Sequence, residues 1–215
     1  MNASKKRKFV WWSHGANATR STATFFSNCF DDFWNYESNQ PAIVGTHDFG
    51  IPKGCEDFII LSNVRNPYTL IVSVYRDFVD ERMRQGIEMP DFKDWVYTET
   101  KESLDSADDS RWQNAGRIPD IFIHMETLEK DLTNLSFVKE WLDEDEKNND
   151  ILENSLNHCI RTNHFMGESS GDKYKNGFQD ISNIYNQDTA NQVVRLYGGE
   201  HYFNKIGYDI DSWKY

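Results

Sequence analysis

The sequence of 215 residues contains few residues that can cross-link the chain or break helices and strands, with three cysteines and five prolines. Cys29, Cys55 and Cys159 lie far apart and form no CxxC pair or Cys/His cluster, so their spacing predicts no zinc site. Few, unpaired cysteines are typical of a reducing compartment, and we expect buried thiols. No run approaches the roughly 20 apolar residues of a membrane helix, and the apolar run after Lys8 is too short for a signal peptide. We therefore expect no membrane insertion and a cytoplasmic location.

Positive charge is also scarce, because 35 acidic residues outnumber 23 basic ones and leave a formal net charge of -12. The electrostatic field of a protein with this net negative charge repels nucleic acids and anionic membranes, and it disfavours long polyanionic glycans as partners. Aromatic residues, by contrast, are plentiful, with 7 Trp, 10 Tyr and 14 Phe. The length and this composition predict one globular domain over residues 1–215.

Apolar runs and helical patterns alternate along the first part of the chain. The expected strands are residues 8–12, 41–49, 57–64 and 118–125, and the expected helices are 19–34, 69–84, 126–132, 136–147, 150–160 and 189–203. Residues 86–117 are polar and acidic and are expected to form either a helical insertion or a flexible lid, and residues 161–177 are expected to form a long loop rich in glycine and serine. Strands without polar alternation that alternate with helices are typical of parallel sheets. We therefore expect an α/β fold, a three-layer α/β/α domain with a short, mostly parallel central sheet.

The segment WWSHGANATRST, residues 11–22, runs from a buried strand through small residues into a helix. Backbone N–H groups at such a helix start favour an anion, and Arg20 adds a permanent charge. The alternative is an ordinary strand-to-helix turn in which serine and threonine cap the helix. The candidate anion-binding residues are Gly15, Ala16, Asn17, Ala18, Thr19, Arg20 and Ser21.

A second motif, VRNPYTLIVSVY, covers residues 64–75. Arg65 follows the apolar strand, and Ser73 follows eight positions later on the next helix, so both side chains can reach one anion. The alternative is that Arg65 pairs with an acidic neighbour and that Ser73 packs against the sheet.

This second motif resembles the 3′-phosphate-binding motif of sulfotransferases that use 3′-phosphoadenosine 5′-phosphosulfate (PAPS), which reads R-N/D-P-x-D-x-x-V-S-x-Y. The matching residues are Arg65, Asn66, Pro67, Val72, Ser73 and Tyr75, and Thr69 replaces the usual aspartate. The resemblance implies a P-loop-NTPase-like fold, PAPS as co-substrate with the 3′,5′-bisphosphate PAP as product, and no metal. It assigns the 3′-phosphate to Arg65 and Ser73.

The resemblance extends to two further segments. In the family's 5′-phosphosulfate loop, K-x-G-T-R, Thr19 and Arg20 match, but Ala16 replaces the lysine and Ala18 replaces the glycine. The segment THDFGIP, residues 46–52, resembles K-T-H-L-P, in which the histidine is the general base, so His47 is the expected base.

Other cations can replace the missing lysine. Arg20, His14 and Lys53 are candidates, as are Lys173 and Lys175 in the predicted loop of residues 161–177. His14 either caps the first loop or donates to the sulfonate. The expected catalytic residues are therefore His47, Arg20 and His14.

The resemblance thus predicts a sulfotransferase that moves a sulfuryl group from PAPS to the hydroxyl or amine of a small-molecule or saccharide acceptor. One alternative is a non-catalytic homologue that binds PAP or PAPS. Another is a P-loop-like nucleotide kinase, which needs a loop lysine and a carboxylate for Mg²⁺, for which Asp48 is a weak candidate. The sequence does not indicate the acceptor or the oligomeric state.

Overall fold

A computed structural model of the chain describes residues 2–12, 19–35, 40–41, 51–88, 90–98, 117–168 and 181–214. The chain divides into two compact units, each built from two separate segments. The first unit comprises residues 1–64 and 111–169, and the second comprises residues 65–110 and 170–215. The unit boundary falls between Val64 and Arg65, inside the motif that resembles a phosphate site. The expected single domain stays a prediction.

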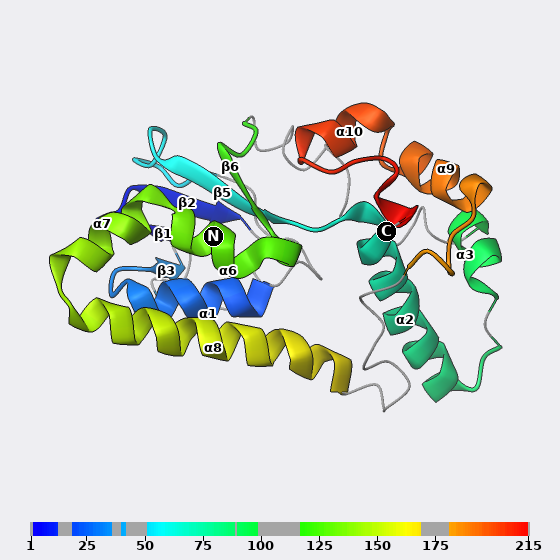
Figure 1. The fold of residues 1–215 in the computed structure, drawn as a ribbon, viewed down its shortest axis with the longest axis horizontal. Helices are drawn as coiled ribbons and strands as arrows, with labels where there is room; N and C mark the ends of the chain where they lie inside the picture. The colour runs from blue at the N-terminus through cyan, green and yellow to red at the C-terminus, as the bar shows by residue number, and fades with distance from the viewer. Residues whose placement is uncertain are drawn as a thin grey trace. The chain divides into compact units, whose positions relative to one another are not determined.

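All strands described lie in the first unit and form one mixed sheet in the order β4-β3-β1-β2-β5-β6 (Figure 1). They are β1 (Asn2–Ser4), β2 (Phe9–Trp12), β3 (Trp34–Asn35), β4 (Gln40–Pro41), β5 (Ile59–Val64) and β6 (Ile121–His124). β2, β5 and β6 are parallel neighbours, whereas β1 pairs antiparallel with β2 and β3, and β3 pairs antiparallel with β4. The prediction of a mostly parallel sheet was therefore wrong for the β4-β3-β1-β2 half. The cause is β1, a polar strand without apolar alternation, which folds back on β2 through a turn.

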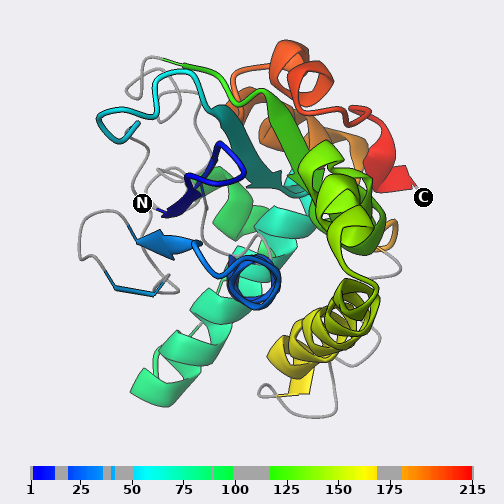
Figure 2. The same cartoon turned by 90° about the vertical axis from the view of Figure 1, so that its left-hand side faces the viewer.

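The first unit also contains four α-helices and one 3-10 helix among its described residues. They are α1 (Thr19–Cys29), η1 (Met125–Thr127), α6 (Leu128–Asn134), α7 (Ser136–Glu144) and α8 (Lys147–Glu168). α1 packs against α8, and the two helices run side by side in Figure 1, whereas Figure 2 shows α1 end-on.

One face of the sheet carries the main core of the first unit. Phe9, Trp11 and Leu61 alternate along their strands and pack on α1, α6 and α7. Phe9 stacks on Phe137 of α7, with ring centroids 4.6 Å apart. Ile60, on the opposite face, is also fully buried. A three-layer arrangement needs helices on both faces of the sheet, and it stays a prediction.

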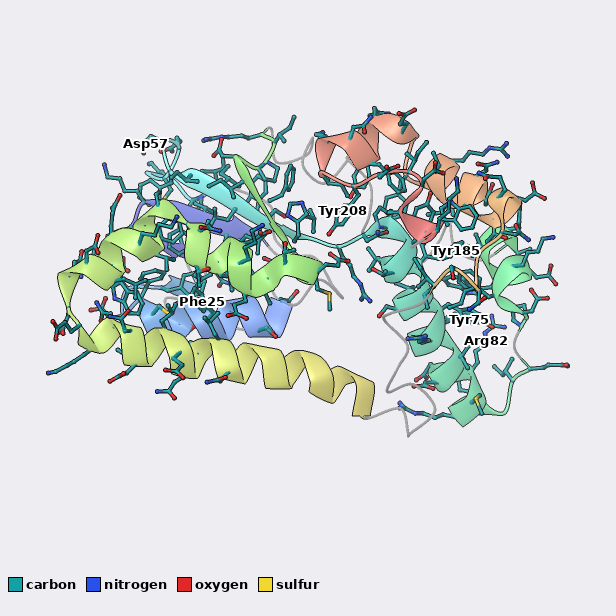
Figure 3. All side chains as sticks on the ribbon, viewed as in Figure 1. Phe25, Asp57, Tyr75, Arg82, Tyr185 and Tyr208 are labelled. Carbon is teal, nitrogen blue, oxygen red and sulfur yellow. The ribbon has the colours of Figure 1, made fainter. Side chains whose placement is uncertain are left out.

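The second unit is helical in its described residues. Its helices are α2 (Pro67–Gln85), α3 (Phe92–Thr98), α9 (Gln187–Leu196), α10 (Glu200–Lys205) and η3 (Ser212–Lys214). Tyr75 of α2 packs on Phe92 and Trp95 of α3, with ring centroids 5.2 Å apart in each pair, and the ring centroid of Tyr185 lies 5.2 Å from that of Phe92. Tyr75 and Tyr185 are labelled in Figure 3. This aromatic cluster holds α2 against α3.

Three expected boundaries were wrong. The helix from Thr19 ends at Cys29, because Asp32 is held in a turn by the Ser4 hydroxyl and the Lys6 N–H, each at 2.7 Å. α8 continues to Glu168, so the first part of the predicted loop 161–177 is helical. The closing helix 189–203 is divided into α9 and α10 at two glycines with positive φ.

Several other expected elements agree with the structure. The strands near 8–12, 57–64 and 118–125 are β2, β5 and β6, and Pro67 opens α2. Cys29 and Cys55 are buried thiols. Of the strand expected at residues 41–49, only Pro41 is described, in β4, and the remainder lies outside the described residues. No described helix combines the length and the apolarity that spanning a bilayer requires.

Candidate functional site

The carboxyl ends of β2, β5 and β6 lie at the same edge of the sheet. These strands are parallel, and their registers pair Trp12 with Ser62 and Val64 with His124. In open α/β sheets, ligands bind outside the carboxyl ends of the parallel strands. The chain leaves this edge into residues 13–18 after β2, into Arg65 after β5, and into η1 after β6.

Buried hydrogen bonds fix the start of α1 relative to this edge. The Trp11 indole Nε1 donates to Asn63 Oδ1 at 2.8 Å, and Asn63 Nδ2 donates to Thr22 Oγ1 at 2.6 Å. All three side chains are at most 1% exposed, and they belong to β2, β5 and α1. These hydrogen bonds therefore connect the first turn of α1, with its N-terminal N–H groups, to both strands.

Among the anion-binding candidates of residues 15–21, the structure describes Thr19 and Ser21 fully and Arg20 in its backbone alone. α1 begins at Thr19, whose side chain is half-buried, and Ser21 is buried. Arg20 belongs to α1, and its side chain lies outside the described part of the chain. The other candidates outside the described residues are His14, Gly15, Ala16, Asn17, Ala18, His47, Lys173 and Lys175. Their assigned roles stay predictions.

The second motif lies across the start of α2. Asn66 caps this helix, its side chain accepting from the Tyr68 N–H at 3.0 Å, and Pro67 occupies the first turn, where a missing N–H costs nothing. Asn66 Nδ2 also donates to Ser212 Oγ at 2.9 Å, and the Tyr68 hydroxyl donates to the carbonyl of Ile210. The helix start is thus fastened to the C-terminal segment of the second unit.

Arg65 lies just before this cap, and its side chain is directed along α2. The residue is 4% exposed, and its Nε donates to Thr69 Oγ1 at 3.0 Å. Ser73 follows Thr69 by four residues, so the two hydroxyls share one face of the helix. Both residues are half-buried. Helix spacing therefore places Ser73 on the side of α2 that Arg65 contacts, and the joint binding of one anion by the two side chains stays a prediction.

The replacement of the family's aspartate by Thr69 changes the charge of this cluster. An aspartate would form an ion pair with Arg65, whereas the Thr69 hydroxyl holds Nε without neutralising the guanidinium. Thr69 in turn donates to the carbonyl of Asn66 at 3.0 Å, which fixes its hydroxyl as an acceptor for Arg65. The bond therefore orients the arginine while preserving its charge.

Tyr197, at the end of α9, is a neighbour of Arg65 that sequence reasoning missed. The side chain is 5% exposed, and its hydroxyl has no hydrogen-bond partner among the described residues. Burial raises the pKa of Tyr197, and the positive charge of Arg65 opposes that rise. The phenol is therefore protonated at neutral pH and can donate. No local pattern relates it to Arg65, because the two are distant in sequence.

A histidine–aspartate pair at the end of β6 was also missed. His124 Nδ1 lies 2.8 Å from Asp131 Oδ2, and the same oxygen accepts the His124 backbone N–H at 2.8 Å. The side chains are 28% and 21% exposed. In the sequence, the pair appears only as a histidine at the end of an apolar run and an aspartate seven residues later.

Comparison with protein-family models, with curated proteins and with solved structures found no match to this chain. Within the described residues, no group of three or more His, Cys, Asp or Glu side chains is arranged to hold a metal ion.

Proposed function

We propose that this protein is a sulfotransferase that moves a sulfuryl group from PAPS to the hydroxyl or amine of a small acceptor. The observation that carries the proposal is that Arg65, directly after a buried strand, donates to Thr69 in the first turn of α2, in alignment by helix spacing with Ser73 four residues later. The sequence motif requires this alignment if Arg65 and Ser73 are to contact one phosphate.

The 3′-phosphate of the nucleotide is assigned to Arg65 and Ser73. The guanidinium offers a fixed, permanent charge with several donors, and the hydroxyl adds a neutral donor. Hydrogen bonds to charged groups contribute about 1.5–3 kcal/mol each, more than neutral ones, so Arg65 is the dominant contact. Burial strengthens it further because solvent screening is reduced.

The 5′-phosphosulfate is assigned to the loop after β2 and to the start of α1. The helix N-terminus supplies backbone N–H groups and the positive end of the helix dipole. Thr19 and Ser21 add hydroxyls and Arg20 adds charge, and the resemblance assigns Gly15, Ala16, Asn17 and Ala18 to the same anion. The Trp11–Asn63–Thr22 hydrogen bonds support this assignment, because they hold the helix start at the carboxyl edge of the sheet.

The reaction is an in-line displacement at sulfur. The acceptor oxygen attacks sulfur, the bond between sulfur and the bridging phosphate oxygen breaks, and PAP leaves with the electron pair. Negative charge grows on that oxygen, and a cation there contributes several kcal/mol, about 3 in related electrostatic sites. Because Ala16 stands at the lysine position, we assign that charge to Arg20, His14 or Lys53, or to Lys173 and Lys175. The base assigned by the resemblance is His47.

Calorimetric titration with PAP tests the nucleotide site without knowledge of the acceptor. We expect micromolar binding to the wild type and a loss of about 10- to 100-fold in Arg65→Ala, equivalent to the loss of one charge-assisted hydrogen bond. Arg84→Ala is the matched control, because Arg84 is exposed on the same helix and its removal changes the net charge equally.

Adenosine 5′-monophosphate is the control ligand for the 3′-phosphate, because it lacks that group. Its weaker binding should be the same in the wild type and in Arg65→Ala. Absence of PAP binding at millimolar concentration would refute the proposal. Equal losses in Arg65→Ala and Arg84→Ala would refute the assignment of the 3′-phosphate.

A further inference from the structure

A cavity of about 580 Å³ opens to solvent in the first unit, between the turn that joins β1 to β2, the end of α1 and the connection from α7 to α8. The turn precedes the start of β2 at Phe9, whereas the proposed nucleotide site lies at the carboxyl ends of the strands. We propose that this cavity binds a small zwitterion of the amino-acid class, whose carboxylate contacts Lys6 and Arg7 and whose ammonium contacts Asp31 and Asp145. The inference goes beyond the proposed sulfuryl transfer and does not depend on it.

Arg7 lines the cavity and has a donor without an acceptor. Its two terminal nitrogens donate to the carboxylate oxygens of Glu144, at 2.7 and 2.6 Å, and its side chain is 8% exposed. Its Nε is buried and has no hydrogen-bond partner among the described residues. Nearly all buried donors in folded proteins have an acceptor, so this N–H indicates a position that a ligand acceptor completes. A carboxylate is the strongest such acceptor for a guanidinium.

Lys6 supplies the positive charge for that carboxylate, because Glu144 already balances the charge of Arg7. The Lys6 side chain is exposed at the cavity, and its ammonium forms no ion pair within the described part of the chain. Two hydrogen bonds anchor the turn that carries both cations. The Lys6 N–H donates to Asp32 Oδ2 at 2.7 Å, and the Arg7 N–H donates to Ser4 Oγ at 3.0 Å. An anchored turn presents its donors with less loss of entropy on binding.

Negative charge faces the same cavity from two helix ends. α1 ends at Cys29 and α7 ends at Glu144, both of which line the cavity, and neither helix has a basic residue in its last turn. The last carbonyl groups of each helix lack partners within the helix and attract a cation. Asp31 and Asp145 follow these ends as exposed, cavity-lining carboxylates, and neither forms an ion pair within the described residues. A ligand ammonium is therefore favoured on this side.

An apolar surface lies beside these charges. Ile151 of α8 lines the cavity and is 38% exposed, and Trp141 of α7 lines it as well. An aliphatic ligand side chain would cover the exposed part of Ile151 and remove apolar surface from water. L-Leucine combines this side chain with both charged groups, so it is the probe for the site.

Calorimetric titration with L-leucine and two analogues tests whether both charges are needed. L-Leucinamide lacks the carboxylate, and 4-methylpentanoate lacks the ammonium. Near pH ~6, where the amino groups are protonated, we expect a dissociation constant for L-leucine below about 1 mM and values at least about 10-fold higher for each analogue. Absence of L-leucine binding at about 10 mM, or an analogue that binds within about twofold of L-leucine, would overturn the proposal.

Substitutions locate the two charged groups of the ligand. Lys6→Gln and Asp31→Asn should each weaken L-leucine binding by about 5- to 10-fold, because each removes one charge-assisted contact. Lys6→Gln should leave the weaker binding of L-leucinamide unchanged, and Asp31→Asn should leave that of 4-methylpentanoate unchanged. Lys139→Gln and Asp143→Asn are the matched controls, since both residues are exposed on α7 and do not line the cavity. A loss in Lys6→Gln or Asp31→Asn no larger than in its control contradicts the assignment.

Nuclear magnetic resonance of the arginine Nε–H groups tests the role of Arg7 directly. The Arg7 signal is assigned by its loss in Arg7→Lys. Saturating L-leucine should shift the Nε–H signal of Arg7 in the wild type but not that of Arg84, an exposed arginine of the second unit. Binding of L-leucine that leaves the Arg7 signal in place would show that the ligand lies elsewhere and would overturn the inference.

Discussion

Replacing Asn63 by alanine tests the hydrogen bonds that connect β2, β5 and α1. The Asn63 side chain is fully buried, accepts from the Trp11 indole at 2.8 Å and donates to Thr22 Oγ1 at 2.6 Å. The substitution leaves the indole N–H without its acceptor and the threonine hydroxyl without its donor. It also removes most of a buried side chain.

The magnitude follows from these two broken bonds. A buried polar group that loses its partner costs about 1–3 kcal/mol, and the indole of Trp11 is buried at 1% exposure. With a smaller loss at Thr22 and a small cavity, we expect Asn63→Ala to lower the free energy of unfolding by about 3 kcal/mol. Thr22→Val removes one bond at nearly constant shape and should cost about 1 kcal/mol.

Urea unfolding followed by tryptophan fluorescence measures the change, with the same m-value expected for all variants. In the double variant, the cost should be less than the sum of the single costs, because both remove the same hydrogen bond. Asn149→Ala, at an exposed position of α8, is the control and should change the free energy by less than about 0.5 kcal/mol. A loss below that value in Asn63→Ala, or strict additivity with Thr22→Val, would refute the reasoning.

Two further predictions concern stability. Arg7 donates to both carboxylate oxygens of Glu144, at 2.7 and 2.6 Å, and this contact lowers the pKa of Glu144. The resulting stabilisation is present above the unfolded pKa of about 4.3 and is lost as pH falls through the lower folded value, so Glu144→Gln should destabilise at pH 7 but not near pH ~2. A constant difference between thermal unfolding temperatures at the two pH values would contradict this. Gly86 ends α2 with a φ of 70°, and an added Cβ would meet no atom within 4 Å, so Gly86→Ala should cost about 1 kcal/mol from backbone strain alone. Gly86→Asn should recover part of that loss in urea unfolding, and equal costs would argue against a backbone origin.

The parallel half of the fold was predictable because its signals are local. β2, β5 and β6 are apolar runs, and α2 opens with an asparagine cap and Pro67. The antiparallel half was not predictable. β1 has no apolar alternation, and its place in the sheet depends on pairing with β2 and β3 and on the hydrogen bond from Ser4 to Asp32.

The residues of the candidate site also fall into a group that the sequence predicted and a group that it did not. Arg65 and Ser73 were identified from a motif contained in one strand end and one helix, where spacing alone places both on one side. The pairing of His124 with Asp131 depends on the turn through η1 into α6. The nearness of Tyr197 to Arg65 depends on how α9 packs in the second unit.

The sequence by itself determined the strand–helix junction after β5, because backbone propensity, capping and apolar periodicity act over a few neighbouring residues. It also determined the types of side chain available there, including Thr69 in place of an acid. Only the tertiary structure decided which strands are neighbours and that Asp131 faces the His124 ring. Those contacts join segments whose separation along the chain carries no periodic pattern, and they form because burial of apolar surface and pairing of polar groups must be satisfied together.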